Sequence, residues 1–184
     1  QPSLDIRWRA SDLRLPNRLA LADAQGKARI SGALQAPLHV ESEVRGIVLR
    51  DTRIDTLAVN VDGSLSAHRV SASLRAGDEQ LQAAASGGID ALRTDARWRG
   101  ELSQLQATGR LALRSEAAAP LSASLRSFDL SRLRLGSEFG RIVIDRLQRD
   151  ERRLATQGHI DALSVAALLP YLRQQAIAST DLAL

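Results

Sequence analysis

The residue types that most often carry chemistry are few in this 184-residue chain, and they stand apart from one another. Its three histidines, His39, His68 and His159, each lie in an alternating segment, and the chain has no cysteine. A zinc site needs several such ligands at close spacing, and no HxxxH pair occurs. We therefore expect structural or surface roles for the histidines and no metal site.

Serine-based catalysis and phosphate-loop chemistry also lack their usual patterns. No G-x-S-x-G elbow accompanies the serines. Neither a G-x-G-x-x-G nor a G-x-x-x-x-G-K pattern includes Gly87 and Gly88, so we interpret this pair as a bend or bulge in a sheet. Glu41 and Glu43 fall on one face of a strand, where solvated charge is the expected role. We expect no catalytic residues, no enzyme activity and no cofactor.

The elements that carry these residues alternate apolar and polar positions with a period of two, which is typical of strands with one dry face. One example is residues 70–87, which alternate on both sides of a Gly77-Asp78 turn signal, and Asp62-Gly63 is a second turn signal. About a dozen short strands of this kind follow one another, which predicts an all-β fold. The dry-face positions that we predict to line a groove are Ile30, Leu34, Leu57, Val59, Val61, Val70, Ala72, Leu74, Leu81, Ala83, Trp98, Leu102, Leu111, Leu113, Ile142 and Ile144.

One segment near the C-terminus departs from this period. Leu168 and Leu172 recur at helical spacing after Ser164, a candidate N-cap, and Pro170 should end or kink the helix. We expect a short helical piece over about residues 164–175. No linker divides the chain, so residues 1–184 are expected to form a single unit.

Composition narrows the range of partners. Only 3% of the residues are aromatic, so a core built from Leu, Ala, Val and Ile should be thin. The net charge of +4 comes from 25 basic and 21 acidic residues that are interspersed, whereas a nucleic-acid site clusters its basic residues. No apolar run is long enough to span a membrane, and no signal peptide is visible. Because the chain starts at Gln1 and has no methionine, we interpret it as a fragment of a longer protein.

The chain also contains short internal sequence repeats. Residues 5–13, DIRWRASDL, resemble residues 95–102, DARWRGEL, and GGIDAL at 87–92 resembles GHIDAL at 158–163. In a strand, Arg-Trp-Arg places the tryptophan on one face and both arginines on the other. Such repetition is typical of a stack in which each unit contacts only its neighbours, although a closed core beneath each tryptophan is the alternative.

Residues 53–113 resemble the middle-to-late region of the TamB family. The resemblance is carried by Val61-Asp62-Gly63-Ser64-Leu65, by Ala67-His68, by Gly87-Gly88, and by Trp98-Arg99-Gly100-Glu101-Leu102 with Leu105. The later GHIDALSVAALLPYL resembles that family's glycine-containing strand followed by a leucine-rich helical piece. The resemblance covers most of the chain, while the family's N-terminal anchor and extreme C-terminal region are not recognisable.

The resemblance implies an elongated curved β-sheet that folds over into an apolar, taco-like trough, as part of an inner-membrane-anchored protein in the periplasm of a Gram-negative bacterium. Such a trough would carry phospholipid acyl chains between the inner and outer membranes and support outer-membrane assembly. It would work with a TamA-like outer-membrane protein, through regions outside this chain.

Two other interpretations remain at this stage. The chain could be a structural or interaction module with no lipid ligand, either a closed β-sandwich or a sheet whose edge strand pairs with an outer-membrane protein during assembly. It could also self-associate end to end through residues 4–8 and 181–184.

Overall fold

A computed structural model describes residues 3–15, 19–31, 33, 35–49, 52–89, 96–110, 112–151 and 153–164. These residues form twelve β-strands and no helix, so the predicted all-β class is confirmed. The described residues accordingly hold no helix that could cross a membrane. The strands are β1 (Ser3–Leu15), β2 (Leu19–Ser31), β3 (Pro37–Leu49), β4 (Thr52–Ser64), β5 (His68–Ala76), β6 (Glu79–Ile89), β7 (Trp98–Thr108), β8 (Leu113–Ser115), β9 (Ala119–Ala123), β10 (Phe128–Ser137), β11 (Gly140–Arg149) and β12 (Leu154–Asp161).

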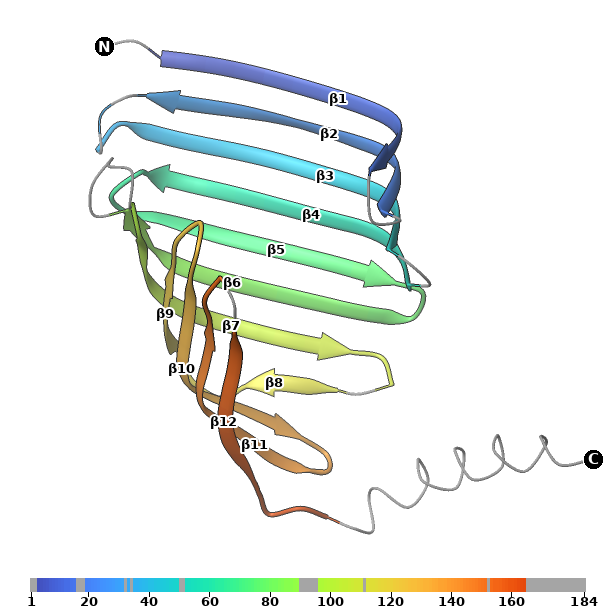
Figure 1. Ribbon diagram of the computed structural model, residues 1–184, viewed down its shortest axis with the longest axis vertical. Helices are drawn as coiled ribbons and strands as arrows, with labels where there is room; N and C mark the ends of the chain where they lie inside the picture. The colour runs from blue at the N-terminus through green and yellow to red at the C-terminus, as the bar shows by residue number, and fades with distance from the viewer. Residues whose placement is uncertain are drawn as a thin grey trace, which may run out of the picture.

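All twelve strands belong to one antiparallel sheet (Figure 1). Each strand pairs with the next in sequence from β1 to β8, and β10, β11 and β12 continue the series. Strand β9 lies beside β8 in sequence, and both pair with β7 on one side and β10 on the other. Strands β8 and β9 therefore act as two halves of one interrupted strand.

Alternation along each strand gives the sheet two chemically different faces. In β5, Val70, Ala72 and Leu74 are half-buried, whereas Ser71 and Ser73 between them are exposed. Cross-strand pairing carries this alternation through β3 to β7, because partners in an antiparallel ladder point to the same side. We call the side of Val70 the apolar face and the side of Ser71 the polar face. The rows that define the apolar face are Val40, Val61, Val70 and Ala85; Val59, Ala72, Ala83 and Leu105; and Val44, Leu57, Leu74, Leu81 and Ala107.

The sheet folds along a line that crosses β7 to β11, which we call the C-terminal crease. Regular strand geometry fails there: the register shifts between β6 and β7, the β8–β9 strand is interrupted, and β11 has a bulge beside Asp145. In β10, Arg132 has a φ of 56°. Because a left-handed residue in a strand reverses the alternation, Leu130 and Leu133, three residues apart, are both buried. The strand segments on the two sides of the crease run in different directions (Figure 1).

The core lies at this crease. Leu133 is 2% exposed and Ala119 is fully buried, and they pack with Leu102, Leu130 and Leu135. We call these five residues the corner cluster. Residues on the opposite side of the bend, Arg132 and Asp145, are exposed. The sheet therefore bends toward its apolar face and buries leucines inside the corner.

A second line of irregularity, the N-terminal crease, crosses β1 to β4. Asp12 in β1 and Gly46 in β3 have φ values of 52° and 62°. A Cβ atom on Gly46 would lie 2.8 Å from the Cβ of Ala22, so the close approach of β2 also favours glycine here. The apolar positions on the two sides of the crease are three residues apart in β3 and β4, as at Val44 and Ile47.

Three local predictions need correction or fall outside the described residues. Asp62 and Gly63 do not form a turn: they stay in β4, paired with His39 and Leu38, and the chain reverses at residues 65–67. The Gly87-Gly88 pair lies in regular β6 rather than at a bulge, because the register shift falls at Ala84 and Ala85. The Gly77-Asp78 turn is confirmed between β5 and β6. The helical piece at 164–175 lies outside the described residues except for Ser164.

Candidate functional site

The apolar face of β4, β5 and β6 holds eight of the predicted groove positions. They lie in register, with Leu57 beside Leu74 and Leu74 beside Leu81. Most are half-buried, and Leu81 is 38% exposed even though its neighbours are apolar. The eight positions are Leu57, Val59, Val61, Val70, Ala72, Leu74, Leu81 and Ala83.

The other predicted groove positions are distributed differently. Ile30 pairs with Leu4 at the β1–β2 end of the apolar face, while Leu34 and Leu111 lie outside the described residues. Leu102 belongs to the corner cluster. Leu113, Ile142 and Ile144 pack against that cluster. The structure thus divides the predicted set between an open surface and a packed corner.

Both tryptophans lie flat on the apolar face where glycine leaves room for them. Trp8 covers Gly26, and a Cβ at that glycine would overlap the indole ring. Trp98 covers Gly87 and Gly100 in the same way, so Gly87, one of the two glycines expected at a bend or bulge, serves close packing instead. The alternation in Arg-Trp-Arg is confirmed at both sites, since the flanking arginines lie on the polar face. Flat rings leave the apolar face without a protruding obstacle.

His68 is an ionisable side chain that shares the apolar face with these rings. Its Nδ1–H donates to the Ser64 carbonyl at 2.8 Å, and its Nε2 accepts from the Trp98 Nε1–H at 2.8 Å. A carbonyl only accepts and an indole N–H only donates, so the two bonds fix the tautomer of the imidazole. His68 therefore positions Trp98 over its glycines.

The polar face carries a ladder of ion pairs between neighbouring strands. Examples are Arg29 Nε with Asp5 Oδ1 at 2.8 Å and Lys27 Nζ with Glu41 Oε2 at 2.9 Å. Glu43 accepts from Arg45 and from Gln25. The hydrogen bonds of Glu41 to Lys27 and then His39 lower the pKa of Glu41, so its carboxylate is charged at neutral pH.

His39 lies between two carboxylates on the polar face. Its Nδ1 is 2.5 Å from Asp62 Oδ1 and its Nε2 is 2.7 Å from Glu41 Oε1. Hydrogen bonds to Asp62 and then to Glu41 raise the pKa of His39 above its ordinary value of 6.5. The protonated ring can donate to both carboxylates, so it links β3 to β4 best in its charged form.

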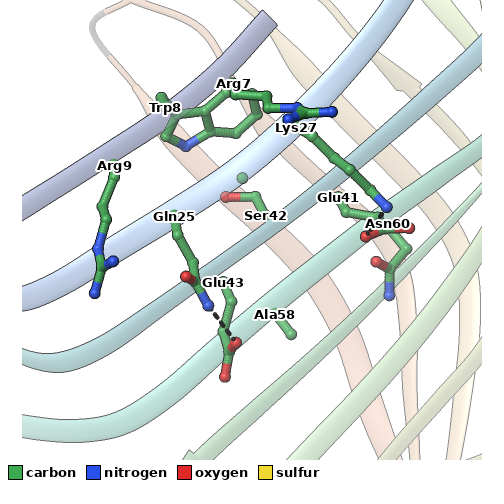
Figure 2. Close-up of a pocket in the computed structure, with 11 residues that line it drawn as sticks. Arg7, Trp8, Arg9, Gln25, Lys27, Glu41, Ser42, Glu43, Ala58 and Asn60 are labelled. Carbon is green, nitrogen blue, oxygen red and sulfur yellow. Dashed lines mark hydrogen bonds and ion pairs between the residues drawn. The ribbon is translucent and has the colours of Figure 1, made fainter.

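An open hollow of about 490 Å³ indents the polar face over β1 to β4 (Figure 2). Arg7, Arg9 and Lys27 supply cations at its β1–β2 side, and Glu41 and Glu43 supply carboxylates from β3. Other hollows, whose lining includes Ser, Gln and Arg residues, indent the same face farther along the sheet. Within the described residues, no group of three or more His, Asp or Glu side chains is arranged to hold a metal ion.

Sequence reasoning missed the two creases, although the chain contains a signal for them. Apolar residues step by three instead of two at Ala10–Leu13, Leu102–Leu105, Leu130–Leu133 and Ile144–Leu147. A single step of three is easily mistaken for the end of one strand and the start of another. The same step in neighbouring strands marks a line along which the whole sheet bends.

Comparison with known proteins was made against family models, curated proteins and solved structures. The family model for the N-terminal domain of TamB matches residues 1–130 of the 184. The chain belongs to the TamB family. The resemblance found in the sequence is thereby confirmed, and the matched region of the family is its N-terminal domain rather than a middle-to-late region.

The TamB family is associated with the bacterial envelope, which agrees with the expected cellular setting at that level. Searches of curated proteins and of solved structures returned no match.

Proposed function

We propose that this chain is a segment of an apolar trough that carries phospholipid acyl chains between the inner and outer membranes of a Gram-negative bacterium. The observation that carries the proposal is the continuous apolar face of β1 to β6, over which the described residues place no second layer. Among the described residues, every two strands that contact each other extensively are also hydrogen-bonded neighbours within the sheet. A closed sandwich would instead place a facing sheet over these rows.

The chemistry of the face suits flexible chains that must move. Its rows hold Val, Leu and Ala, and its rings lie flat on glycines. Each methylene removed from water contributes about 0.8 kcal/mol, and similar neighbouring positions allow a chain to slide. Six strands at ~4.8 Å spacing give roughly 25 Å of such surface across β1 to β6.

Family membership supports the wider setting of this proposal. We place the parent protein in the periplasm, anchored in the inner membrane and working with a TamA-like outer-membrane partner. Lipid carriage needs no nucleophile and no cofactor, so we assign the chain no enzyme activity.

The proposal is tested by lipid extraction and rebinding. Mass spectrometry of solvent extracts of the purified chain should detect phospholipid, and the delipidated chain should bind a labelled fatty acid. Leu74→Arg should reduce that binding at least about tenfold, because a charge on the apolar face loses its hydration when a chain covers it.

Ser73→Arg is the matched control, since Ser73 neighbours Leu74 but lies on the polar face. It should bind like the unmodified chain. Absence of binding in a delipidated chain of native strand content, or equal loss in both variants, would contradict the proposal.

A further inference from the structure

The β1–β2 side of the polar-face hollow places like charges directly opposite each other. Arg7 in β1 pairs in register with Lys27 in β2, and both line the hollow. Like charges at directly opposed positions destabilise a strand pair. Other opposed charges on this face are complementary and in contact, as with Asp5 and Arg29 or Lys27 and Glu41. The Arg7–Lys27 pair differs from these two pairs, because both of its members are cations.

Arg7 has no ion pair or hydrogen-bond partner for its side chain among the described residues. Arg9, two residues along the same strand, is 3.7 Å from Asp23, with its side chain 76% exposed. Figure 2 shows the Arg7 side chain extending from β1 toward Lys27. Three cations therefore gather at one side of the hollow. Arg7 has no carboxylate partner in the described part of the chain, Arg9 has a long contact with Asp23, and Lys27 has an exposed ion pair with Glu41.

The carboxylates of the hollow are already engaged. Glu43 accepts from Arg45 and Gln25, and Glu41 accepts from His39 as well as from Lys27. Lys27 can therefore turn toward another anion without leaving Glu41 unpaired. Its present contact is an exposed ion pair, of the kind that contributes little to stability.

We propose that Arg7 and Lys27, with Arg9 beside them, form a binding site for a phosphate group. A guanidinium presents paired donors that match phosphate oxygens, and an ammonium adds a mobile second charge. A phosphate between Arg7 and Lys27 converts their repulsion into two attractions. The phosphate can be the free ion or the headgroup of a lipid, which share this chemistry. The site lies on the face opposite the apolar rows, so it does not depend on lipid carriage there.

Nuclear magnetic resonance of the 184-residue chain tests the site with inorganic phosphate as the probe. The Arg7 Nε–Hε signal should shift and saturate during titration at constant ionic strength, with chloride as the balancing anion. Arg7→Gln should weaken binding, followed at backbone amides of β1 and β2, at least about threefold through the loss of a charge-assisted hydrogen bond. Arg75→Gln, an exposed arginine on the same face in β5, should bind as the unmodified chain does.

A second variant separates a ligand site from a purely structural defect. Arg7→Glu places opposite charges across β1 and β2, so its midpoint of thermal unfolding without phosphate should equal or exceed that of the unmodified chain. Its response to phosphate should be lost. A non-saturating titration, or equal phosphate responses in Arg7→Gln and the unmodified chain, would overturn the proposal.

Two further probes identify the source of the phosphate. Displacement of bound inorganic phosphate by glycerol 3-phosphate and by vesicles of phosphatidylglycerol, but not of phosphatidylcholine, would assign the site to anionic lipid headgroups. Binding of inorganic phosphate that none of these competitors displaces would assign the site to the free ion. Both results retain the site, and neither depends on uptake of acyl chains by Leu74 and its neighbours.

Discussion

The two ends of this sheet use the same residue types in different ways. Across β1 to β6 the apolar face is flat enough to leave Leu81 38% exposed, whereas across β7 to β11 the face bends inward and leaves Leu133 at 2%. Composition does not cause this contrast, because both ends are rich in Leu and Ala. A bend toward the apolar face is what converts a one-sided sheet into a core.

The comparison teaches that the C-terminal crease supplies much of the stability and the β1–β6 face supplies surface. A half-buried leucine on an open sheet gains only part of the hydrophobic free energy that full burial provides. The molecule can therefore expose a long apolar surface because another region stabilises it.

The largest expected effect is at the corner cluster. Leu133→Ala should lower the free energy of unfolding by about 2–5 kcal/mol, because it leaves a cavity in a packed corner. Leu74→Ala, on the open face, should cost about 1 kcal/mol, since its site is already partly solvated. Urea unfolding followed by circular dichroism compares the two. Equal losses would contradict the division between core and surface.

The tryptophans provide a second comparison. Trp98→Ala should lower the free energy of unfolding by about 2–3 kcal/mol, since it uncovers Gly87 and Gly100 and leaves His68 without its donor. Trp8→Ala should cost less, because Trp8 is 37% exposed. Thermal unfolding measures both. A larger loss of unfolding free energy for Trp8→Ala than for Trp98→Ala would contradict the account, because it would place the more stabilising packing at β1 and β2.

Both creases should favour glycine at their positive-φ positions, so adding and removing a glycine should have effects of opposite sign on stability. Arg132 holds a positive φ at the cost of strain, so Arg132→Gly should stabilise the chain by about 0.5–1 kcal/mol. Gly46→Ala should destabilise it by about 1–2 kcal/mol, because it adds both that strain and a contact with Ala22. Unfolding midpoints check the signs, and a loss on Arg132→Gly would show that the bend does not depend on this conformation.

The smallest expected effect is the pH dependence of His39. Its pKa is raised in the folded chain, so its contribution to stability is complete below about pH 6.5 and is lost as the pH rises through the folded value. His39→Gln should remove the part of the decline in stability that begins above about pH 6.5. Unfolding midpoints of both proteins over this range provide the measurement. If the unfolding midpoints of the two proteins change with pH in the same way, His39 does not contribute to this pH dependence.

Local sequence patterns determine much of this fold and only part of its shape. Alternation in β5 and β6 and the Gly77-Asp78 turn correctly predict strands, facing and a hairpin, because these depend on neighbouring residues. The bend does not follow from any single strand. It depends on irregular positions of neighbouring strands lying opposite each other, as Arg132 in β10 does with Asp145 in β11, which only strand pairing establishes.

The polar face was harder to predict for the same reason. His39 and Glu41 are neighbours on one face of β3, but Asp62 is 23 residues from His39 in sequence, and only the register of β3 with β4 places it in contact. The like-charge pair of Arg7 and Lys27 is equally invisible without the alignment of β1 with β2. In this sheet, many ion pairs and hydrogen bonds join side chains of neighbouring strands. The sequence identifies such residues but not their partners.

The most direct test of the central claim maps where an acyl chain lies. Stearic acid with a nitroxide near its methyl end should broaden the methyl signals of Leu57, Val59 and Leu74 on the open apolar face. Signals of Leu130 and Leu133 inside the corner cluster should stay sharp, because that corner is already filled. Broadening confined to the corner cluster, or no broadening of the β4 and β5 methyls in a folded chain, would contradict the account.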